Sequence, residues 1–387
     1  MLNKTIHKSK NAYFLGKDSV DYARHNSHYV THTLREMPKT ALTHCKVTSK
    51  SRQTLFFSNP VYILSGGSVV AKRESKGPVG KYFDKVFEEN IKIPFEKEEL
   101  SMLKKAITLC IDKSKLKISD IDMLFAGDLL NQITSSCFAA RDLKIPFFGL
   151  YSACSTFTQA LASGASFINA GYFDNVACAT ASHFASAERQ FRNPLEYGAQ
   201  RPPYSQWTVT GAGCTMLSNG GDNDILNIFS NVSPRITSAT YGKVVDFGIK
   251  DVANMGGAMA PSALDTLICL LSDTGYSVED FDLIITGDLG KLGSDMLRDL
   301  ALEQGILLGK NYTDCGVLIY DSTQDCYQGG SGAGCSAVVF NGFILEMIKQ
   351  KRYKRIALLA TGALLSPQSV LQGESIPGIC HGVVIEI

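Results

Sequence analysis

Apolar residues recur along this chain at two spacings, one typical of helices and one typical of buried strands. Residues 95–112 place Leu100, Leu103, Ile107 and Ile111 at helical spacing, which predicts an amphipathic helix. Short apolar runs predict buried strands at 61–64, 123–126, 145–150, 175–181 and 356–365. Helices that alternate with short apolar strands are typical of an α/β fold.

The segment that follows the first of these strands is rich in turn-forming residues. Ser65-Gly66-Gly67 is interpreted as a turn, and Lys76-Gly77-Pro78 as a loop. A short helix is expected near Tyr82–Glu89.

The sequence contains an internal repeat. Residues 122–129 match residues 282–289, and farther on Cys154 matches Cys335 and Thr180 matches Thr361. The preserved order argues for a duplicated unit of about 150 residues, roughly one domain. We therefore predict two related α/β halves, 54–235 and 236–387, with strand ends that face a shared cleft.

Charge is distributed unevenly along the chain. The whole sequence has a formal net charge of +1, but residues 1–53 hold ten Lys and Arg against three Asp and Glu. The remaining body is therefore acidic, and it lacks the basic surface that nucleic-acid binding requires. Residues 1–53 show no sustained periodicity, which predicts a poorly ordered extension or a basic arm that contacts anionic lipid.

Apolar runs and cysteines narrow the class of protein further. No run approaches the ~20 apolar residues that span a bilayer, and no secretory signal peptide is recognisable. The eleven cysteines are scattered and form no CxxC motif. This pattern favours a reduced compartment over a disulfide framework or a zinc site.

Cys154 is the first candidate for chemistry. It follows the apolar run 145–150 and opens a helix of small residues, so it occupies an elbow where the helix dipole favours a thiolate and binds anions. His183 follows the strand 175–181 and could pair with Cys154 as a base or ion-pair partner. The alternatives are a buried structural cysteine and a hydrogen-bonded core histidine.

Charged residues near these strand ends suggest ligand contacts. Arg189 and Arg192 share a helix face and could clamp a carboxylate, although surface ion pairs with Glu188 or Glu196 are an equal alternative. Asp128 and Asp288 end the two matching strands, with Asn131 just beyond the first. A helix N-cap is the favoured role for each aspartate, and a calcium ion or a donor-bearing ligand is the alternative.

A glycine-rich loop at residues 329–335 contains Gly330 and Ser331. Glycine permits close backbone approach to a ligand and exposes N–H groups to anions, whereas the alternative is a plain tight turn. The loop lacks the Lys-[Ser/Thr] ending of nucleotide-binding loops. His381, near the last strand, is interpreted as structural.

Several blocks, in order, resemble the stage V sporulation protein AD family of the thiolase superfamily, from about residue 54 to 387. They lie at 126–132, 153–156, 182–183, 187–192, 255–261, 286–289, 314–316, 329–332, 360–367 and 381–384. The resemblance implies a thiolase-like fold, with two pseudo-symmetric halves in α-β-α-β-α layers, and a homodimer.

The same resemblance implies a ligand and a location. The family is associated with dipicolinic acid, which is pyridine-2,6-dicarboxylate, and with its calcium chelate. A member is expected to bind this ligand during dipicolinate uptake into the developing spore. It is expected to lie at the cytoplasmic side of the spore inner membrane, peripheral to it, with other stage V sporulation A proteins as membrane partners.

The resemblance also bears on catalysis. Condensing enzymes of the ketoacyl synthase III type use Cys, His and Asn, and Cys154 matches the nucleophile. Gly287-Asp288 stands where the histidine is expected, and the Ser331–Gly334 stretch replaces the expected asparagine. We therefore expect a non-catalytic binding protein without a resident cofactor, to which calcium comes with the ligand. An active Cys-dependent acyltransferase is the alternative.

Overall fold

The computed structural model describes residues 53–387, apart from 89, 91, 192–200 and 221–233. All but the last residue of the predicted extension therefore lie outside the described residues. Ten strands follow one path through a large sheet, in the order β11-β10-β13-β14-β9-β2-β8-β6-β4-β5.

The ten strands form two sets with the same topology. The first set comprises β2 (Tyr62–Val70), β4 (Met123–Gly127), β5 (Phe147–Gly149), β6 (Asn175–Ser182) and β8 (Gly211–Ser218). The second comprises β9 (Arg235–Thr240), β10 (Leu283–Thr286), β11 (Tyr312–Asp314), β13 (Arg355–Ala363) and β14 (Gly378–Glu386). In each set three parallel strands continue into two antiparallel ones. The sequence repeat thus corresponds to a repeated strand order.

The two sets meet at a single residue pair, Tyr62 with Arg235. The boundary predicted between the halves falls at the first residue of β9. Shorter strands complete the fold: β1 (Thr54–Phe56) pairs with β9, β3 (Lys85–Val86) with β2, and β7 (Trp207–Thr208) with β12 (Gly330–Ser331).

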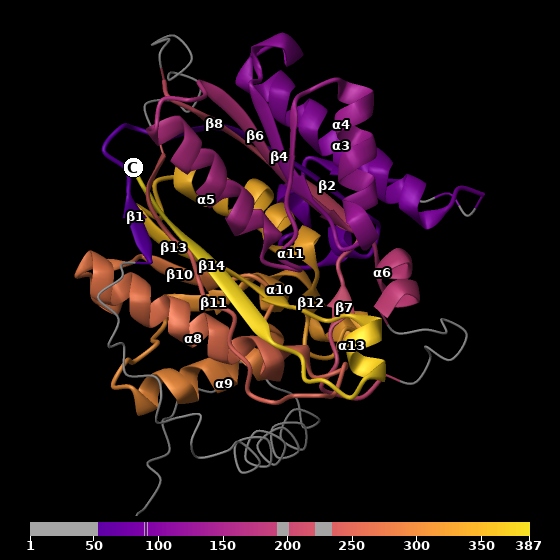
Figure 1. Ribbon diagram of the computed structural model, residues 1–387, viewed down its shortest axis with the longest axis vertical. Helices are drawn as coiled ribbons and strands as arrows, with labels where there is room; N and C mark the ends of the chain where they lie inside the picture. Colours follow the sequence, from indigo (N-terminus) through magenta and orange to yellow (C-terminus); the bar gives the residue numbers. More distant parts are fainter. Residues whose placement is uncertain (1–52, 89, 91, 192–200, 221–233) are drawn as a thin grey trace, which may run out of the picture.

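Helices lie on both sides of each strand set and between the two sets. Helices α3 (Phe95–Ser114) and α4 (Thr134–Leu143) belong to the first half, and α8 (Met255–Thr274) and α9 (Gly290–Glu303) to the second. Helix α5 (Thr156–Asn169) contacts strands of both sets and also α11 (Ala333–Val339). Figure 1 shows α3 and α4 at the top, α5 and α11 in the middle and α8 and α9 below. The predicted α-β-α-β-α layers are confirmed.

The remaining helical segments are short. They are α6 (Phe184–Phe191), α10 (Cys315–Ile319), α12 (Leu345–Lys349), α13 (Pro367–Leu371), the π-helical turn η9 (Phe340–Ile344) and the 3-10 turns η1 (Glu74–Lys76), η2 (Gly80–Tyr82), η3 (Ile118–Asp120), η4 (Asn131–Ile133), η7 (Val278–Asp280) and η8 (Ser322–Gln324).

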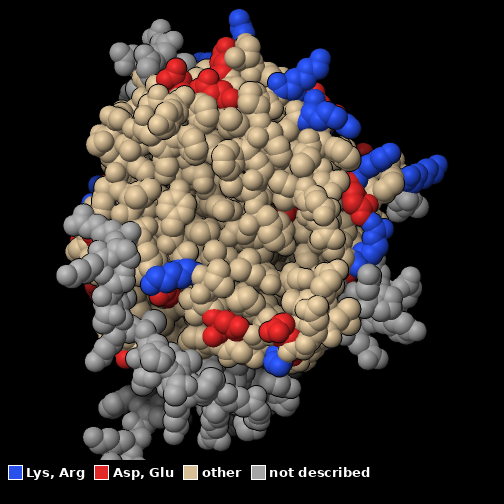
Figure 2. All heavy atoms as spheres, viewed as in Figure 1, with Lys and Arg blue, Asp and Glu red and all other residues tan. Residues whose placement is uncertain are grey.

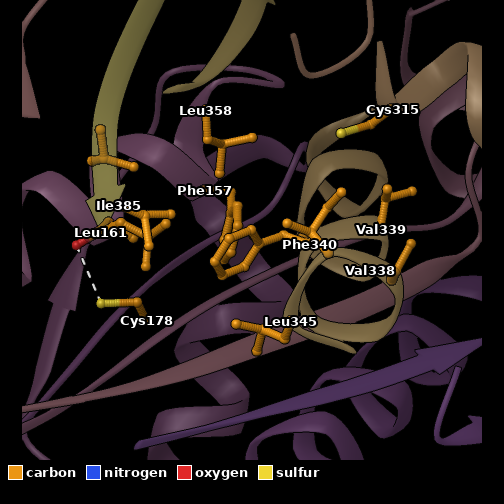
Figure 3. Close-up of a cluster of buried hydrophobic side chains, with 14 of the residues drawn as sticks. Phe157, Leu161, Cys178, Cys315, Val338, Val339, Phe340, Leu345, Leu358 and Ile385 are labelled. Atoms are coloured by element: carbon orange, nitrogen blue, oxygen red, sulfur yellow. Dashed lines mark hydrogen bonds between the residues drawn. The ribbon is translucent and has the colours of Figure 1, made fainter. Parts of the chain in front are cut away.

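The central core lies between the strand sets. The rings of Phe157, from α5, and Phe340, from η9, have centroids 5.7 Å apart. Leu358 of β13 and Ile385 of β14 surround them, as Figure 3 shows. Cys178 belongs to this core as a structural thiol, since its Sγ donates to Ala160 O at 3.2 Å. Burial of these apolar side chains drives the two halves together.

Two local predictions about the segment after the first strand are wrong. Ser65-Gly66-Gly67 is not a turn but continues β2. A Cβ on Gly67 would lie 2.3 Å from Ala106 O of α3, and a Cβ on Gly66 would lie 2.4 Å from Asn341 Oδ1 of η9. The two glycines therefore allow close packing on both faces of β2 rather than a reversal of the chain.

The helix expected near Tyr82–Glu89 is also absent from the described residues of that segment. Only the turn η2, which ends at Tyr82, precedes the strand β3. Lys85 and Val86 pair in parallel with Val69 and Val70, so sheet pairing overrides the local helical tendency. The helix predicted at 95–112 is confirmed, and so are the buried strands predicted at 61–64, 123–126, 175–181 and 356–365. A strand also forms within 145–150, but β5 is an exposed edge strand and not a buried one.

Helix α8 has the length and mean hydropathy of a membrane span, contrary to the expectation from the apolar runs in the sequence. However, 78% of its most apolar window is buried inside the fold, and it packs against α9 and β14. Core helices of this kind are hydrophobic on all sides.

Candidate functional site

Cys154 lies on the turn between β5 and α5, where the sequence predicts an elbow. Ala153 has a φ of 47°, in the left-handed region that residues with a side chain rarely adopt. The Ser152 N–H donates to Thr156 Oγ1 at 3.0 Å, and the Ser155 N–H donates to Ser152 O at 3.0 Å. These bonds hold the turn, and Cys154 lines a recess next to it.

Both halves of the protein contribute to this recess, which encloses about 460 Å³ including open solvent. Its apolar lining consists of Leu129, Ala153, Ala187, Phe191, Met255, Met259, Ala363 and Leu365, and its polar lining of Tyr151, Cys154, Thr208 and Ser331. No Lys, Arg or His is among the described residues that line it. An adjoining space of about 840 Å³ shares Tyr151, Phe191 and Leu365 with the recess.

The Cys154 thiol contacts the carboxylate of Asp288, and the Gly332 N–H and the Ser331 side chain lie within hydrogen-bonding reach. Burial, followed by the charge of Asp288, raises the pKa of Cys154 well above the usual range of a thiol. At neutral pH Cys154 is therefore a protonated thiol beside a carboxylate. The elbow does not favour a thiolate here, contrary to the expectation from its position before α5.

Asp288 is held by donors on three sides. Gly332 N–H and Ser331 Oγ–H donate to Oδ2 at 2.9 and 3.2 Å, and Thr361 Oγ–H donates to Oδ1 at 2.9 Å. With the Cys154 thiol, this makes four donors for the roughly four lone-pair sites of a carboxylate. Burial nevertheless raises the pKa of Asp288 to about 6.

The N-cap role favoured for Asp288 is wrong. The first N–H groups of α9, on Leu289 and Gly290, donate to Asp314 instead, at 2.9 and 3.0 Å. Asp314 also accepts from Val317 N–H at 3.1 Å, so it caps both α9 and α10. Because Asp314 caps α9, the carboxylate of Asp288 can accept hydrogen bonds from the glycine-rich loop instead.

Asp128, the counterpart of Asp288 in the first half, has a different setting. Its Oδ2 accepts from Ser136 N–H at 2.8 Å and Ser136 Oγ–H at 2.7 Å, and its Oδ1 from Leu130 N–H at 3.0 Å. Asp128 therefore caps the first turn of α4 from outside the N-cap position, which Ile133 occupies. It is fully buried and does not line the recess.

Calcium coordination by Asp128 and Asp288 would have to displace these donors. Within the ranges that the structure describes, no group of three or more His, Cys, Asp or Glu side chains is arranged to hold a metal ion. The fit of the two repeated carboxylates to a resident calcium ion is therefore poor.

His183 lies apart from Cys154. Its Nε2 is 3.2 Å from Glu98 Oε2, and its ring stacks on Phe95. The space next to His183 encloses about 750 Å³ and is lined by Arg73, Glu74 and Trp207 among others, not by Cys154. The predicted pairing of His183 with Cys154 is thus replaced by a pairing with Glu98.

Arg189, the first residue of the predicted arginine clamp, forms a surface ion pair instead. Its side chain is half exposed, and its partner is Glu96 and not the expected Glu188 or Glu196. Arg192 lies outside the described residues.

The glycine-rich loop approaches the site closely, as expected. Gly330 and Ser331 form β12, and Gly332 has a φ of 105°, which a residue with a side chain would not tolerate. Gly332 N–H and Ser331 are directed at Asp288 rather than at an open ligand site. Asn131 lines the adjoining space and donates its N–H to Gln190 Oε1 at 2.9 Å.

Two residues of this site, Thr361 and Asp314, are not among the candidates predicted from the sequence, and His381 has a larger role than expected. Thr361 could have been found, because it matches Thr180 in the repeat, whereas nothing in the sequence marked Asp314 as a cap of two helices.

His381 supports the turn that carries Cys154. His381 Nδ1 accepts from Gly242 N–H at 3.2 Å, so Nε2 carries the proton and faces Ser152 Oγ at 3.2 Å. His381 thus supports the elbow as a neutral imidazole.

Comparison with solved structures identifies the fold. Over 84% of this chain it resembles all of 3-oxoacyl-[acyl-carrier-protein] synthase III from Aquifex aeolicus VF5, with a TM-score of 0.52 at 14% identity. Over 86% of the chain it resembles 99% of a variant of OleA from Xanthomonas campestris, with a TM-score of 0.55 at 13% identity. These likenesses confirm the predicted thiolase-like fold.

Sequence comparison gives the family. Residues 51–386 match the family model of stage V sporulation protein AD (SpoVAD). The chain is also 42% identical to stage V sporulation protein AD of Bacillus subtilis (strain 168) over 344 residues, which is 88% of this chain and 98% of that protein. Two sequence matches over nearly the whole body thus agree with the fold and with the predicted resemblance. The chain belongs to the stage V sporulation protein AD family of sporulation proteins.

Proposed function

We propose that this protein binds dipicolinic acid, or its calcium chelate, in the recess beside Cys154 during dipicolinate uptake into the developing spore. The observation that carries the proposal is the contact between Cys154 and Asp288. An open recess between the two halves is retained, while its cysteine is held as a neutral thiol. This combination suits ligand binding better than nucleophilic catalysis.

The lining of the recess favours a flat ligand without net charge, such as a dianion neutralised by a bound calcium ion. Phe191, Met255 and Met259 offer apolar surface to a pyridine ring, and Tyr151 offers a hydroxyl group to one of its carboxylates. The hydroxyls of Ser331 and Thr208 already donate to Asp288 and Glu188. The described lining supplies no cation, and Asp288 lies directly behind it. A one-to-one calcium chelate carries no net charge, so we expect it to bind more tightly than the free dianion.

Calorimetric titration tests this proposal. Pyridine-2,6-dicarboxylate is titrated into the purified full chain with and without calcium, and pyridine-3,5-dicarboxylate, which cannot chelate in the same way, serves as the ligand control. Saturable binding that strengthens with calcium is expected. Absence of heat under both conditions contradicts the proposal.

Two alanines of α6 provide a matched pair of variants for locating the ligand. Ala187 lines the recess, whereas Ala185 lines the separate space next to His183. Ala187→Leu should fill the recess and weaken binding at least about tenfold, because a steric clash easily exceeds about 1.4 kcal/mol. Ala185→Leu should leave binding unchanged. The reverse result would move the ligand to the space next to His183.

An acyltransferase remains the second candidate, because Cys154 keeps its elbow and lines the recess. Incubation with acyl-CoA followed by intact-mass measurement decides this question. An acyl adduct that disappears in Cys154→Ala would establish the enzyme, and no adduct is expected if Asp288 keeps the thiol neutral.

Peripheral attachment to the spore inner membrane and contact with other stage V sporulation A proteins are part of the same proposal. The support is charge: residues 1–53 carry ten basic and three acidic side chains. Each Lys or Arg near an anionic surface contributes about 1 kcal/mol. Deletion of residues 1–53 should reduce sedimentation with vesicles of anionic lipid, and unchanged sedimentation would contradict this attachment.

A further inference from the structure

Four hydrogen-bond donors converge on one point beside the recess. They are the backbone N–H of Gly332, the hydroxyls of Ser331 and Thr361 and the thiol of Cys154. They come from distant segments: the elbow before α5, the glycine-rich loop and strand β13. Such a cluster of inward-facing donors normally binds a carboxylate or the oxygen of a polarised carbonyl group.

These donors bind no external ligand, because both carboxylate oxygens of Asp288 accept their hydrogen bonds. Asp288 is 1% exposed, and its backbone O accepts from Gln206 Nε2 at 2.6 Å, which fixes the segment that carries it. An incoming ligand therefore finds Ser331 and Cys154 already committed to an internal anion.

We propose that Asp288 is an internal substitute for a ligand carboxylate: it occupies an anion-binding donor set beside Cys154 and thereby suppresses the reactivity of that thiol. Removal of the Asp288 carboxylate should leave a vacant site for a small free carboxylate. It should also turn Cys154 into a reactive cysteine at the start of α5. The proposal goes beyond dipicolinate binding and does not depend on which ligand fills the recess.

The other titratable groups near Cys154 act weakly or in the same direction. The pKa of Cys154 is raised by burial first and by Asp288 second. Cys335, Asp314 and Cys315 lie behind Asp288, where burial raises the pKa of each. Tyr151 lies in front, and burial raises its pKa to about 12. His381 reaches the elbow through Ser152 as a neutral ring. Among these groups, Asp288 is the carboxylate in direct contact with the thiol.

The first experiment measures the rate at which iodoacetamide alkylates Cys154, as a function of pH, by mass spectrometry of the Cys154 peptide. In this reaction the sulfur forms a bond to carbon, iodide leaves and the thiol proton passes to solvent. Asp288→Asn preserves the volume of the side chain but removes its charge. We expect alkylation at about pH 8 to accelerate at least about tenfold, which corresponds to a shift of about one pH unit in the profile.

Asp128→Asn is the matched control, because Asp128 is the repeated counterpart and is just as deeply buried. It accepts three hydrogen bonds of its own but is not in contact with Cys154. This variant should leave the profile of Cys154 at the wild-type position. Equal profiles for wild type and Asp288→Asn would overturn the proposal. A wild-type profile with a midpoint below about 8.5, the value of a free thiol, would also overturn it, even if the variants fail to fold.

The second experiment tests the vacant site by chemical rescue of Asp288→Ala. Added sodium formate should raise the melting temperature of this variant and slow its alkylation towards the wild-type rate, whereas sodium chloride at equal ionic strength should not. Formate should leave the wild type unchanged. Equal effects of formate and chloride on Asp288→Ala would contradict a carboxylate site. Because no dipicolinate is used, failure here is distinct from failure of the proposed function.

Discussion

The Thr361 hydroxyl donates a hydrogen bond to Asp288 Oδ1 at 2.9 Å, across the neighbouring ends of β13 and β10. In the first half its counterpart Thr180 donates instead to Ala333 O, at 2.8 Å, at the start of α11. The repeat therefore supplies the same residue type at equivalent strand ends for different partners. One threonine anchors a buried carboxylate, and the other anchors the helix that follows the glycine-rich loop.

Replacement of Thr361 by valine should destabilise the protein, because Asp288 would lose a donor in a buried position. We expect a loss of about 1–3 kcal/mol in the free energy of unfolding, measured by urea denaturation. Thr361→Ser keeps the hydroxyl and should recover most of the loss. A loss in Thr361→Ser but not in Thr361→Val would mean that packing of the methyl group, not the hydrogen bond, matters.

Glu99 should make the stability of the protein decrease as pH rises. Burial, and next the charge of Asp128, raises the pKa of Glu99 well above its ordinary value of 4.5. The fold therefore keeps a proton that the unfolded chain releases. This contribution is complete below pH 4.5 and is lost as pH rises through the raised pKa of the folded state.

Glu99→Gln mimics the protonated side chain and should remove this loss. Its melting temperature relative to wild type should increase steadily between about pH 5 and about pH 9, roughly the range above an ordinary carboxyl pKa. Glu303→Gln, at an exposed position, serves as the control and should show no such trend. A constant difference between Glu99→Gln and wild type across this range would contradict the prediction.

His381 should produce the opposite dependence at acidic pH. Burial lowers the pKa of His381 to about 4, from an ordinary value of 6.5. The unfolded chain therefore takes up a proton that the fold excludes. Stability is complete above pH 6.5 and is lost as pH falls towards 4, by up to about 3 kcal/mol.

His381→Asn should be less stable than wild type at neutral pH but should flatten the curve between the ordinary pKa of histidine, 6.5, and the lowered value of about 4. Urea denaturation at several pH values measures both effects. An unchanged slope in the variant would show that His381 is not the residue that titrates.

The expected homodimer should form through the edge of the first strand set. Strand β5 ends the path of the sheet, and its Phe148 is 43% exposed. Edge strands with exposed apolar side chains are prone to pairing. Figure 2 shows a broad area without Lys, Arg, Asp or Glu over α5, with charged residues above it, to its right and below it.

Phe148→Asp should convert a dimer into a monomer in light scattering coupled to size-exclusion chromatography. Leu302→Asp, on α9 and also exposed, is the control and should keep the dimer. A dimer that survives Phe148→Asp would place the interface elsewhere.

Local patterns in the sequence were sufficient to predict much of the fold. Helical spacing located α3, and apolar runs located β2, β4, β5, β6 and β13. The repeat predicted two related halves, which the structure shows as two strand sets with the same topology. These predictions hold because periodicity reflects burial of one face or both faces of an element. The turn expected at Ser65-Gly66-Gly67 is wrong because a glycine pair also allows a strand to be packed closely on both faces, here by α3 against Gly67 and by η9 against Gly66.

The pairing of His183 with Cys154 shows the limit of the same reasoning. Both residues follow strand ends, but successive side chains at a strand end point to opposite faces of the sheet. Ser182 Oγ accepts from Gly334 N–H at 3.0 Å, on the side of α11. His183, the next residue, therefore points away, towards Glu98 of α3.

The sequence by itself determined the α/β class, the duplicated order of strands and the elbow that carries Cys154, because each depends on residues close together in the chain. Tertiary structure alone decided that Asp288 contacts Cys154. These two residues lie in different halves, and their contact depends on how the halves pack around α5 and α11. That packing buries a carboxylate against a thiol and excludes water, so the charge of Asp288 acts strongly on Cys154.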